Sequence, residues 1–96
     1  MAQEIISYPY LTMKHSYITQ GTCSRQIDLE VDDNGVISSV SFYGGCHGNL
    51  QGIARLVQGM KAEEAISKLE GIRCGYKETS CPDQLAKALR ETLQLH

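Results

Sequence analysis

The segment 26–43 constrains the fold more than any other part of the chain. Residues 26–32 alternate polar and apolar side chains, and residues 37–43 are rich in β-branched and aromatic residues. The dipeptide Asn34-Gly35 separates the two runs, and it favours a type I′ turn because both of its residues tolerate positive φ. The sequence therefore predicts a β-hairpin with a two-residue turn.

A two-residue turn also fixes which residues of the two strands face each other. Leu29 then lies opposite Val40, and apolar side chains of both strands share one face of the sheet. The same register, continued outwards, places Cys23 opposite Cys46 on that face. Directly opposed residues in an antiparallel pair have Cα atoms about 4.5–5.5 Å apart. We therefore expect Cys23 and Cys46 to be neighbours.

The remaining sequence pattern predicts one more strand and three helices. Residues 12–20 have strand character, although neither face of this strand is clearly apolar. Apolar residues recur at helical spacing in residues 48–58 and 62–69, and each run is followed by a glycine that can end a helix. A last helix is expected to open with Ser-x-x-Asp at residues 80–83 and to run through Leu93. The predicted fold is α+β, a small antiparallel sheet of about three strands with three helices packed on one face.

Length and composition are those of one small globular domain. The chain has 96 residues, of which 42% are hydrophobic and 21% are charged, and its formal net charge is −2. This length predicts a single domain over residues 1–96, with residues 1–11 as a flexible N-terminal segment. It is too short for an independent radical enzyme or a dinucleotide-dependent dehydrogenase. The net charge gives no reason to expect a nucleic-acid polymer as a partner.

The N-terminal sequence favours a cytoplasmic protein. It has no basic leader, and the chain contains no run of the roughly 18 apolar residues that a membrane span requires. We therefore expect no membrane partner, and a compartment in which thiols stay reduced. In such a protein, four cysteines favour metal binding or thiol chemistry over structural disulfides.

The four cysteines are the candidate functional residues. Cys46 and Cys81 lie where predicted helices begin, and the positive end of a helix dipole stabilises a thiolate there. Cys23 and Cys74 lie next to glycine-containing turns. Four thiolates brought to one end of the sheet would satisfy a tetrahedral zinc site. The chain contains no Cys-x-x-Cys pair, however, so four inert half-buried thiols and a redox-active pair stay as alternatives.

Two residues beside these cysteines are interpreted structurally. We expect His47 to be a polar capping residue rather than a ligand, and Asp83 to cap its helix. No phosphate-binding loop, nucleophile–base pair or paired catalytic carboxylates can be identified in the sequence. Catalysis by this chain alone is therefore not expected.

Residues 79–83 read Thr-Ser-Cys-Pro-Asp, the motif after which the TSCPD domain family is named. Together with Gly21-Thr-Cys-Ser24, Gly44-Gly-Cys-His-Gly-Asn49 and Cys74, they resemble the stand-alone four-cysteine branch of that family over roughly residues 14–93. In larger proteins this domain is attached to vitamin B12-dependent ribonucleotide reductases. The resemblance implies an accessory or interaction domain with a protein partner, and it makes a nucleotide a candidate ligand. It also implies a metal, with zinc expected, at Cys23, Cys46, Cys74 and Cys81, and it leaves a ribonucleoside-diphosphate reductase component as an alternative function.

A looser likeness is to the iron–sulfur cluster scaffold proteins. These share a cysteine at a strand start, a hairpin, a Gly-Cys-Gly-like turn into a helix, and a cysteine that opens a late helix. The corresponding features are Cys23, Cys46-His-Gly48 and Cys81. The scaffold family has an Asp beside its first cysteine, whereas Ser24 follows Cys23 here. This likeness implies a similar fold and an alternative function, in iron–sulfur cluster assembly or sulfur transfer.

Overall fold

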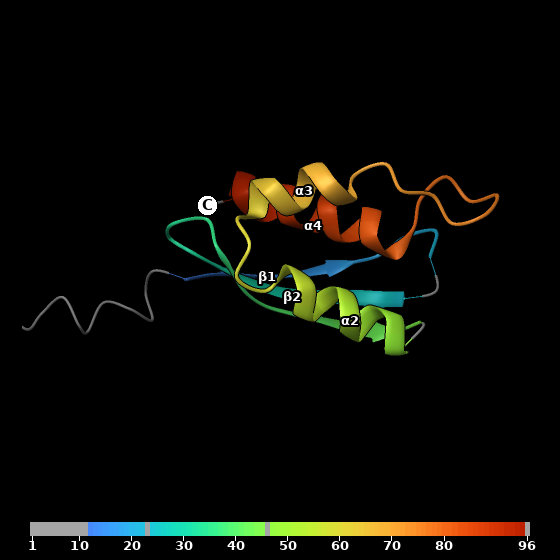
Figure 1. Ribbon diagram of the computed structural model, residues 1–96, viewed down its shortest axis with the longest axis horizontal. Helices are drawn as coiled ribbons and strands as arrows, with labels where there is room; N and C mark the ends of the chain where they lie inside the picture. Colours follow the sequence, from blue (N-terminus) through green and yellow to red (C-terminus); the bar gives the residue numbers. More distant parts are fainter. Residues whose placement is uncertain (1–11, 23, 46, 96) are drawn as a thin grey trace, which may run out of the picture.

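The computed structural model describes residues 12–22, 24–45 and 47–95 (Figure 1). Three antiparallel strands form one sheet in the order β1 (Thr12–Ile18), β2 (Ser24–Asp32) and β3 (Ile37–Gly44). The helices α2 (His47–Val57), α3 (Ala62–Leu69) and α4 (Cys81–Leu95) follow. The predicted flexible segment 1–11 lies outside the described residues. Within the described ranges, no helix is long and apolar enough to cross a membrane.

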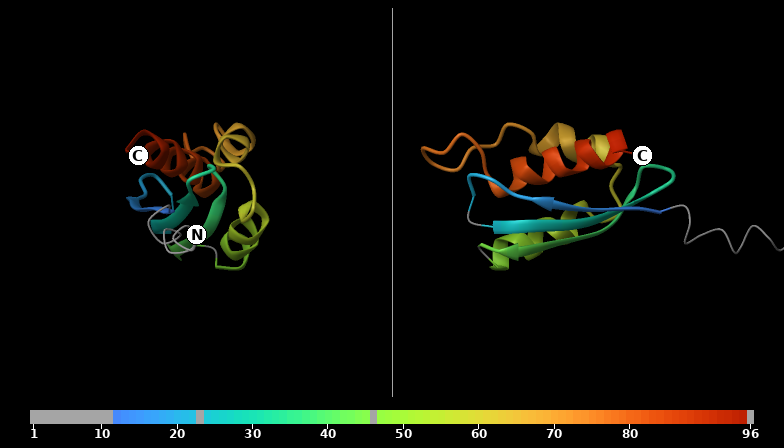
Figure 2. Two further views of the ribbon diagram at one scale, coloured as in Figure 1. Left: turned by 90° about the vertical axis from the view of Figure 1, so that its left-hand side faces the viewer. Right: turned by 180° about the vertical axis from the view of Figure 1, so that it is seen from behind.

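The three helices lie along one face of the sheet, which confirms the predicted α+β fold (Figure 2). The helix α3 packs on α4, α4 packs on β1 and β2, and α2 packs on β3. In β2, the buried side chains of Ile27, Leu29 and Val31 alternate with half-buried ones, as expected for a sheet that is covered on one face. The buried apolar core lies between the two layers and consists of Ile27, Leu29, Val31, Ile37, Val40, Val57, Ala62, Ala65, Ile66, Leu85, Ala86, Ala88 and Leu89.

The hairpin turn differs from the predicted two-residue turn. Gly35 has a φ of 81°, but no non-glycine residue in the described ranges has a positive φ, so Asn34 does not adopt the type I′ conformation. The N–H of Gly35 donates to the carbonyl of Asp32 at 3.0 Å. The carboxylate of Asp32 accepts the N–H groups of Asn34 and Val36, both at 2.9 Å. These bonds stabilise a three-residue loop, with a type I turn followed by a left-handed glycine.

The predicted strand register is confirmed only in the middle of the hairpin. Leu29 lies opposite Val40 as expected, but the pairing shifts by one residue towards both ends, where Val31 pairs with Ile37 and Ser24 pairs with Gly44. Near the turn the shift follows from the longer loop. The predicted pairing of Cys23 with Cys46 lies outside the described residues, and the irregularity after Ser24 interrupts the register on which that prediction depends.

The helix bounds follow the sequence signals closely. The bounds of α3 agree with the prediction, and α2 begins and ends one residue earlier than predicted. Gly59 and Gly71 have φ values of 92° and 88°, so both adopt the left-handed conformation that ends a helix. The strand β1 ends two residues before the predicted boundary at residue 20, because the chain turns into the β1–β2 loop, in which Gly21 has a φ of 76°.

Substitution of two glycines separates backbone strain from crowding. Gly35 and Gly45 have similar φ values, 81° and 84°, but a Cβ atom at Gly35 would meet nothing within 4 Å. At Gly45 it would lie 3.1 Å from the backbone nitrogen of Ser24 and 3.0 Å from Cδ1 of Leu50. We expect Gly35→Ala to lower the free energy of unfolding by about 1–2 kcal/mol. Gly45→Ala should lower the free energy of unfolding further, because the Ser24 backbone must also move. Urea unfolding measures both effects, and an equal loss of stability in the two variants would contradict the close packing at Gly45.

Candidate functional site

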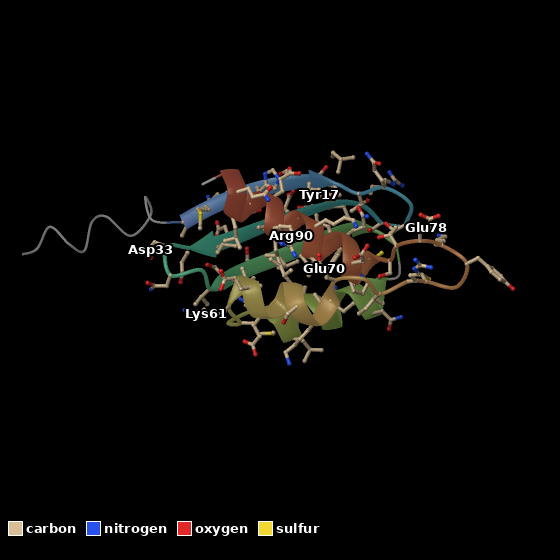
Figure 3. The ribbon with its side chains drawn as sticks, turned by 90° about the horizontal axis from the view of Figure 1, so that it is seen from above. Tyr17, Asp33, Lys61, Glu70, Glu78 and Arg90 are labelled. Atoms are coloured by element: carbon tan, nitrogen blue, oxygen red, sulfur yellow. The ribbon has the colours of Figure 1, made fainter. Side chains whose placement is uncertain are left out.

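Three connections of the chain meet at the end of the molecule opposite the hairpin turn (Figure 1). They are the β1–β2 loop, the junction between β3 and α2, and the loop 70–80 that precedes α4. In Figure 3, Glu78 marks this end, whereas Asp33 and Lys61 mark the other. A Cβ atom at Gly21 would lie 3.0 Å from Cγ2 of Thr79, so the β1–β2 loop directly contacts the loop 70–80.

Cys81 is the first residue of α4, and it faces the core as predicted. Its exposed fraction is 8%. The sulfur lies 3.2 Å from Oγ of Ser24, the first residue of β2 and 57 residues away in the chain. Ser24 is itself buried, and its hydroxyl lies 3.1 Å from that of Thr22. The Cys81 sulfur therefore contacts a buried hydroxyl group as well as the apolar core.

Cys74 lies in the loop 70–80 and is exposed. Its N–H donates to the carbonyl of Thr79 at 3.2 Å, and its carbonyl accepts the N–H of Lys77 at 3.0 Å. Gly75 adopts a left-handed conformation between them, with a φ of 58°. These two hydrogen bonds close a small turn that has Cys74 at its base. As a result, Cys74 lies next to the beginning of α4, although six residues separate it from Cys81 in the chain.

A largely apolar cleft of about 480 Å³ lies between α2 and the beginning of α4. Cys74, Cys81 and Pro82 line one side of it, and Gly48 and Leu56 are among the residues of α2 that line the other. Pockets of roughly 300–1,000 Å³ are typical of small-ligand sites. The structure therefore brings two of the four cysteines to one cleft, beside the first turn of α2.

The other two predicted site residues, Cys23 and Cys46, lie outside the described residues. Their chain neighbours Ser24 and Gly45 are described, and they are in close contact, because a Cβ atom at Gly45 would lie 3.1 Å from the Ser24 nitrogen. Within the described ranges, no three His, Cys, Asp or Glu side chains are arranged to hold a metal ion. The predicted four-cysteine set therefore stays a prediction. The side chain of His47 is also outside the described part of the chain.

Ser80, and not Asp83, caps α4. The hydroxyl oxygen of Ser80 accepts the N–H of Asp83 at 3.1 Å, which is the capping bond expected of the residue before a helix. The same hydroxyl donates to the carbonyl of Ile72 at 2.7 Å. Ser80 therefore fixes the start of the helix and also holds the first part of the loop 70–80 against it.

The carboxylate of Asp83 anchors the loop instead of capping the helix. It accepts the N–H of Gly71 at 2.7 Å and the hydroxyl of Thr79, and it forms an ion pair with Lys87 at 3.3 Å. Burial acts to raise the pKa of Asp83, but the hydrogen bonds from Thr79 and Gly71 and the ion pair with Lys87 outweigh this effect. The pKa of Asp83 therefore lies below its ordinary value of 3.8. Both ends of the loop that carries Cys74 depend on this one side chain.

Two residues that position the site were missed by the sequence interpretation. Ser24 would face away from the helices if β2 alternated strictly, but the irregularity between Ser24 and Gln26 turns its side chain inwards. Gln84 is 3% exposed, and its side chain accepts the N–H of Gln20 and donates to the hydroxyl of Thr79, both at 3.0 Å. It joins the β1–β2 loop to the loop 70–80. The sequence signal that could have indicated this connection is a glutamine placed next to the apolar positions of α4.

Asp83→Asn tests the anchoring role of the carboxylate. We expect this variant to lower the free energy of unfolding at pH 7 by about 1–3 kcal/mol, because a buried hydrogen-bond acceptor is replaced in part by a donor. Because its pKa is lowered in the folded state, the Asp83 carboxylate contributes its full stabilisation above pH 3.8, and this is lost as the pH falls through the folded-state pKa. Chemical unfolding between pH 3 and 7 should therefore show a weaker acid dependence in Asp83→Asn. The exposed Asp33 provides the control Asp33→Asn, and equal effects of the two substitutions would contradict the anchoring role.

The sequence was compared with protein-family models, curated proteins and solved structures. It matches the model of the TSCPD domain over residues 6–93. No curated protein and no solved structure gives a match. The matched range includes all four cysteines and the Ser80 and Asp83 contacts described above. The chain therefore belongs to the TSCPD domain family.

Proposed function

We propose that this TSCPD domain is a metal-binding accessory domain in which Cys23, Cys46, Cys74 and Cys81 hold one zinc ion. The observation that carries the proposal is that Cys74 and Cys81 line the same cleft, although one is on a loop and the other opens a helix. Thiolates are strong zinc ligands, and four of them form a closed tetrahedral site. The donor set of the chain therefore fits this metal.

Chain connectivity supports the inclusion of Cys23 and Cys46. Consecutive Cα atoms are 3.8 Å apart, so neither residue can be far from its described neighbours. Cys23 directly precedes Ser24, whose hydroxyl contacts the Cys81 sulfur. Cys46 directly follows Gly45, which packs against the backbone of Ser24. Cys23 is thus next in the chain to a residue that contacts Cys81, and Cys46 is next to a residue that lies close to Ser24 and Leu50.

The position of Cys81 at the start of α4 offsets part of the cost of a negatively charged sulfur at this buried site. The first residues of a helix have N–H groups without helical partners, and the helix dipole is positive at this end. Both effects stabilise a thiolate relative to a thiol. In the proposed site, Cys81 would be a rigid ligand because it is buried, whereas Cys74 reaches the metal from an exposed loop.

The family supports an accessory rather than a catalytic role. In larger proteins the TSCPD domain accompanies vitamin B12-dependent ribonucleotide reductases, so we propose a protein partner of that class. The residues that line the cleft are mainly apolar, with the two thiols and the polar residues Asn49 and Ser80 beside them, and none of these lining residues is a typical general base. A structural or exchangeable metal that shapes an interaction surface accounts for this composition better than an independent reductase does.

Metal content tests the proposal directly. We expect the protein, purified under reducing conditions, to contain close to one equivalent of zinc per chain. A strong chelator should remove the zinc, and it should increase the number of rapidly titrating thiols towards four, because metal-bound thiolates are protected. A metal content below about 0.2 equivalents, with four thiols that titrate freely from the start, would contradict a closed metal site.

Cys74→Ser distinguishes a metal ligand from an inert exposed thiol. Because Cys74 is exposed, we expect the variant to unfold at nearly the same urea concentration as the metal-free parent. Its zinc affinity is measured by competition with a chromophoric chelator. The affinity should fall by more than roughly 10–100-fold, which is the loss typical when a residue is substituted that contacts a metal ligand but does not bind the metal itself. Tyr76→Phe, at an exposed position of the same loop, is the matched control. If Cys74→Ser binds zinc as tightly as Tyr76→Phe does, then Cys74 is not a ligand.

The exposure of Cys74 favours a second candidate function. A cluster or a sulfur atom held at an exposed thiol can be passed to a partner, as expected of an iron–sulfur or sulfur-transfer scaffold. Anaerobic incubation of the metal-free protein with iron and sulfide should then produce visible absorption that Cys74→Ser abolishes. Absence of iron uptake would dispose of this candidate, whereas stoichiometric zinc in the protein as purified would retain the first.

A further inference from the structure

We infer that Ser24 is a positioning residue for the Cys81 sulfur, and that its hydroxyl donates a hydrogen bond to the metal-bound thiolate. The inference rests on the proposed metal site, because it assigns a role within that site. It adds a residue that is not itself a ligand. Its basis is the buried contact of 3.2 Å between Ser24 Oγ and Cys81 Sγ.

The Ser24 hydroxyl is held in place from several directions. The Ser24 backbone pairs with Gly44 of β3, and its carbonyl accepts the hydroxyl of Thr19 at 2.5 Å. Gly45 lies close to the same backbone, because a Cβ atom at Gly45 would be 3.1 Å from the Ser24 nitrogen. The exposed fraction of Ser24 is only 4%. A hydroxyl on such a fixed backbone can impose a direction on the sulfur that it contacts.

The number of available protons determines the direction of the hydrogen bond. A serine hydroxyl has one proton and two acceptor sites, whereas a thiolate has no proton. When Cys81 is a thiolate, the contact is a hydrogen bond only if Ser24 donates to the sulfur. The Thr22 hydroxyl lies 3.1 Å from Ser24 Oγ and 3.4 Å from the Ser24 carbonyl oxygen, so its one proton has two acceptors on Ser24. When it donates to the nearer acceptor, Oγ, Thr22 and Ser24 form a short donor chain that ends at the sulfur.

Such a donor affects metal binding in two ways. It engages one lone pair of the sulfur, which leaves another lone pair for the metal, and it compensates part of the negative charge that a buried thiolate brings to the site. Residues that orient metal ligands in this way typically contribute about 10–100-fold to metal affinity. Ser24 also directly follows Cys23 in the chain. It would therefore position the ligand Cys81 through its side chain, and it is bonded to the ligand Cys23 through the backbone.

The experiment compares Ser24→Ala with Thr22→Val, and it uses Ser39→Ala, an exposed serine of β3, as the control. We expect Ser24→Ala to lower zinc affinity about 10–100-fold, Thr22→Val to lower it less, and Ser39→Ala to leave it unchanged. Ser24→Thr, which retains the hydroxyl, should restore most of the affinity. In Co²⁺-loaded protein, Ser24→Ala should shift the sulfur-to-cobalt charge-transfer band, because a hydrogen bond to the sulfur lowers the energy of its lone pairs. A purely structural role would not move this band.

The outcomes separate this inference from the proposed function. If the parent binds zinc and Ser24→Ala has the same zinc affinity and the same cobalt spectrum as the parent, the role of Ser24 is overturned. The metal site itself is then left intact. No zinc uptake by the parent overturns the metal site itself. If Ser24→Ala unfolds, Thr22→Val still tests the donor chain.

A double-mutant cycle of Ser24→Ala and Cys81→Ala in the metal-free protein measures the contact independently, and we expect a coupling of about 2–10-fold in the unfolding equilibrium constant. Additive effects would contradict the contact.

Discussion

Ser24 and Cys81 are 57 residues apart in the chain, and their side chains meet at 3.2 Å. This buried contact joins the beginning of β2 to the beginning of α4, and the surrounding loops are arranged around it. Gln84, one turn into α4, contacts the β1–β2 loop on one side and Thr79 on the other. The Ser24–Cys81 contact is therefore one of several that hold these segments together at the proposed metal site.

The core and the site are stabilised by different interactions. The sheet and the helices are held together by apolar side chains such as Leu29 and Leu85, which are non-directional in their packing. At the cleft, by contrast, the loops are held by directional hydrogen bonds that Ser80 and Gln84 donate and that the Asp83 carboxylate accepts. Directional bonds fix sulfur positions more sharply than apolar packing does, and fixed ligand positions are what a tetrahedral metal ion requires. A bound metal would in turn link loops that are otherwise held by a few polar contacts.

The sequence was most informative where periodicity and burial act together. The bounds of α3 were predicted from apolar spacing and a following glycine. The pairing of Leu29 with Val40 was predicted from a two-residue turn, and it holds although the turn is longer, because a second irregularity near Val31 compensates. The turn at Gly35 was predicted incorrectly, because the Asp32 side chain binds two turn amides and stabilises a longer loop. The inward orientation of Ser24 could not be predicted, since it depends on a local irregularity of the β2–β3 pairing. The anchoring role of Asp83 could not be predicted either, since it depends on how the loop 70–80 folds back onto the start of α4. Cys74 and Cys81 line one cleft, whereas the gathering of all four cysteines stays a prediction, because Cys23 and Cys46 lie outside the described residues.

X-ray absorption spectroscopy of the zinc-loaded protein tests the central claim most directly, because it counts the sulfur atoms around the metal. The account predicts four sulfur ligands at about 2.3 Å and no light-atom ligand. A first shell with two or fewer sulfurs, completed by nitrogen or oxygen at about 2.0–2.1 Å, would show that the four cysteines do not share one site and would contradict the account.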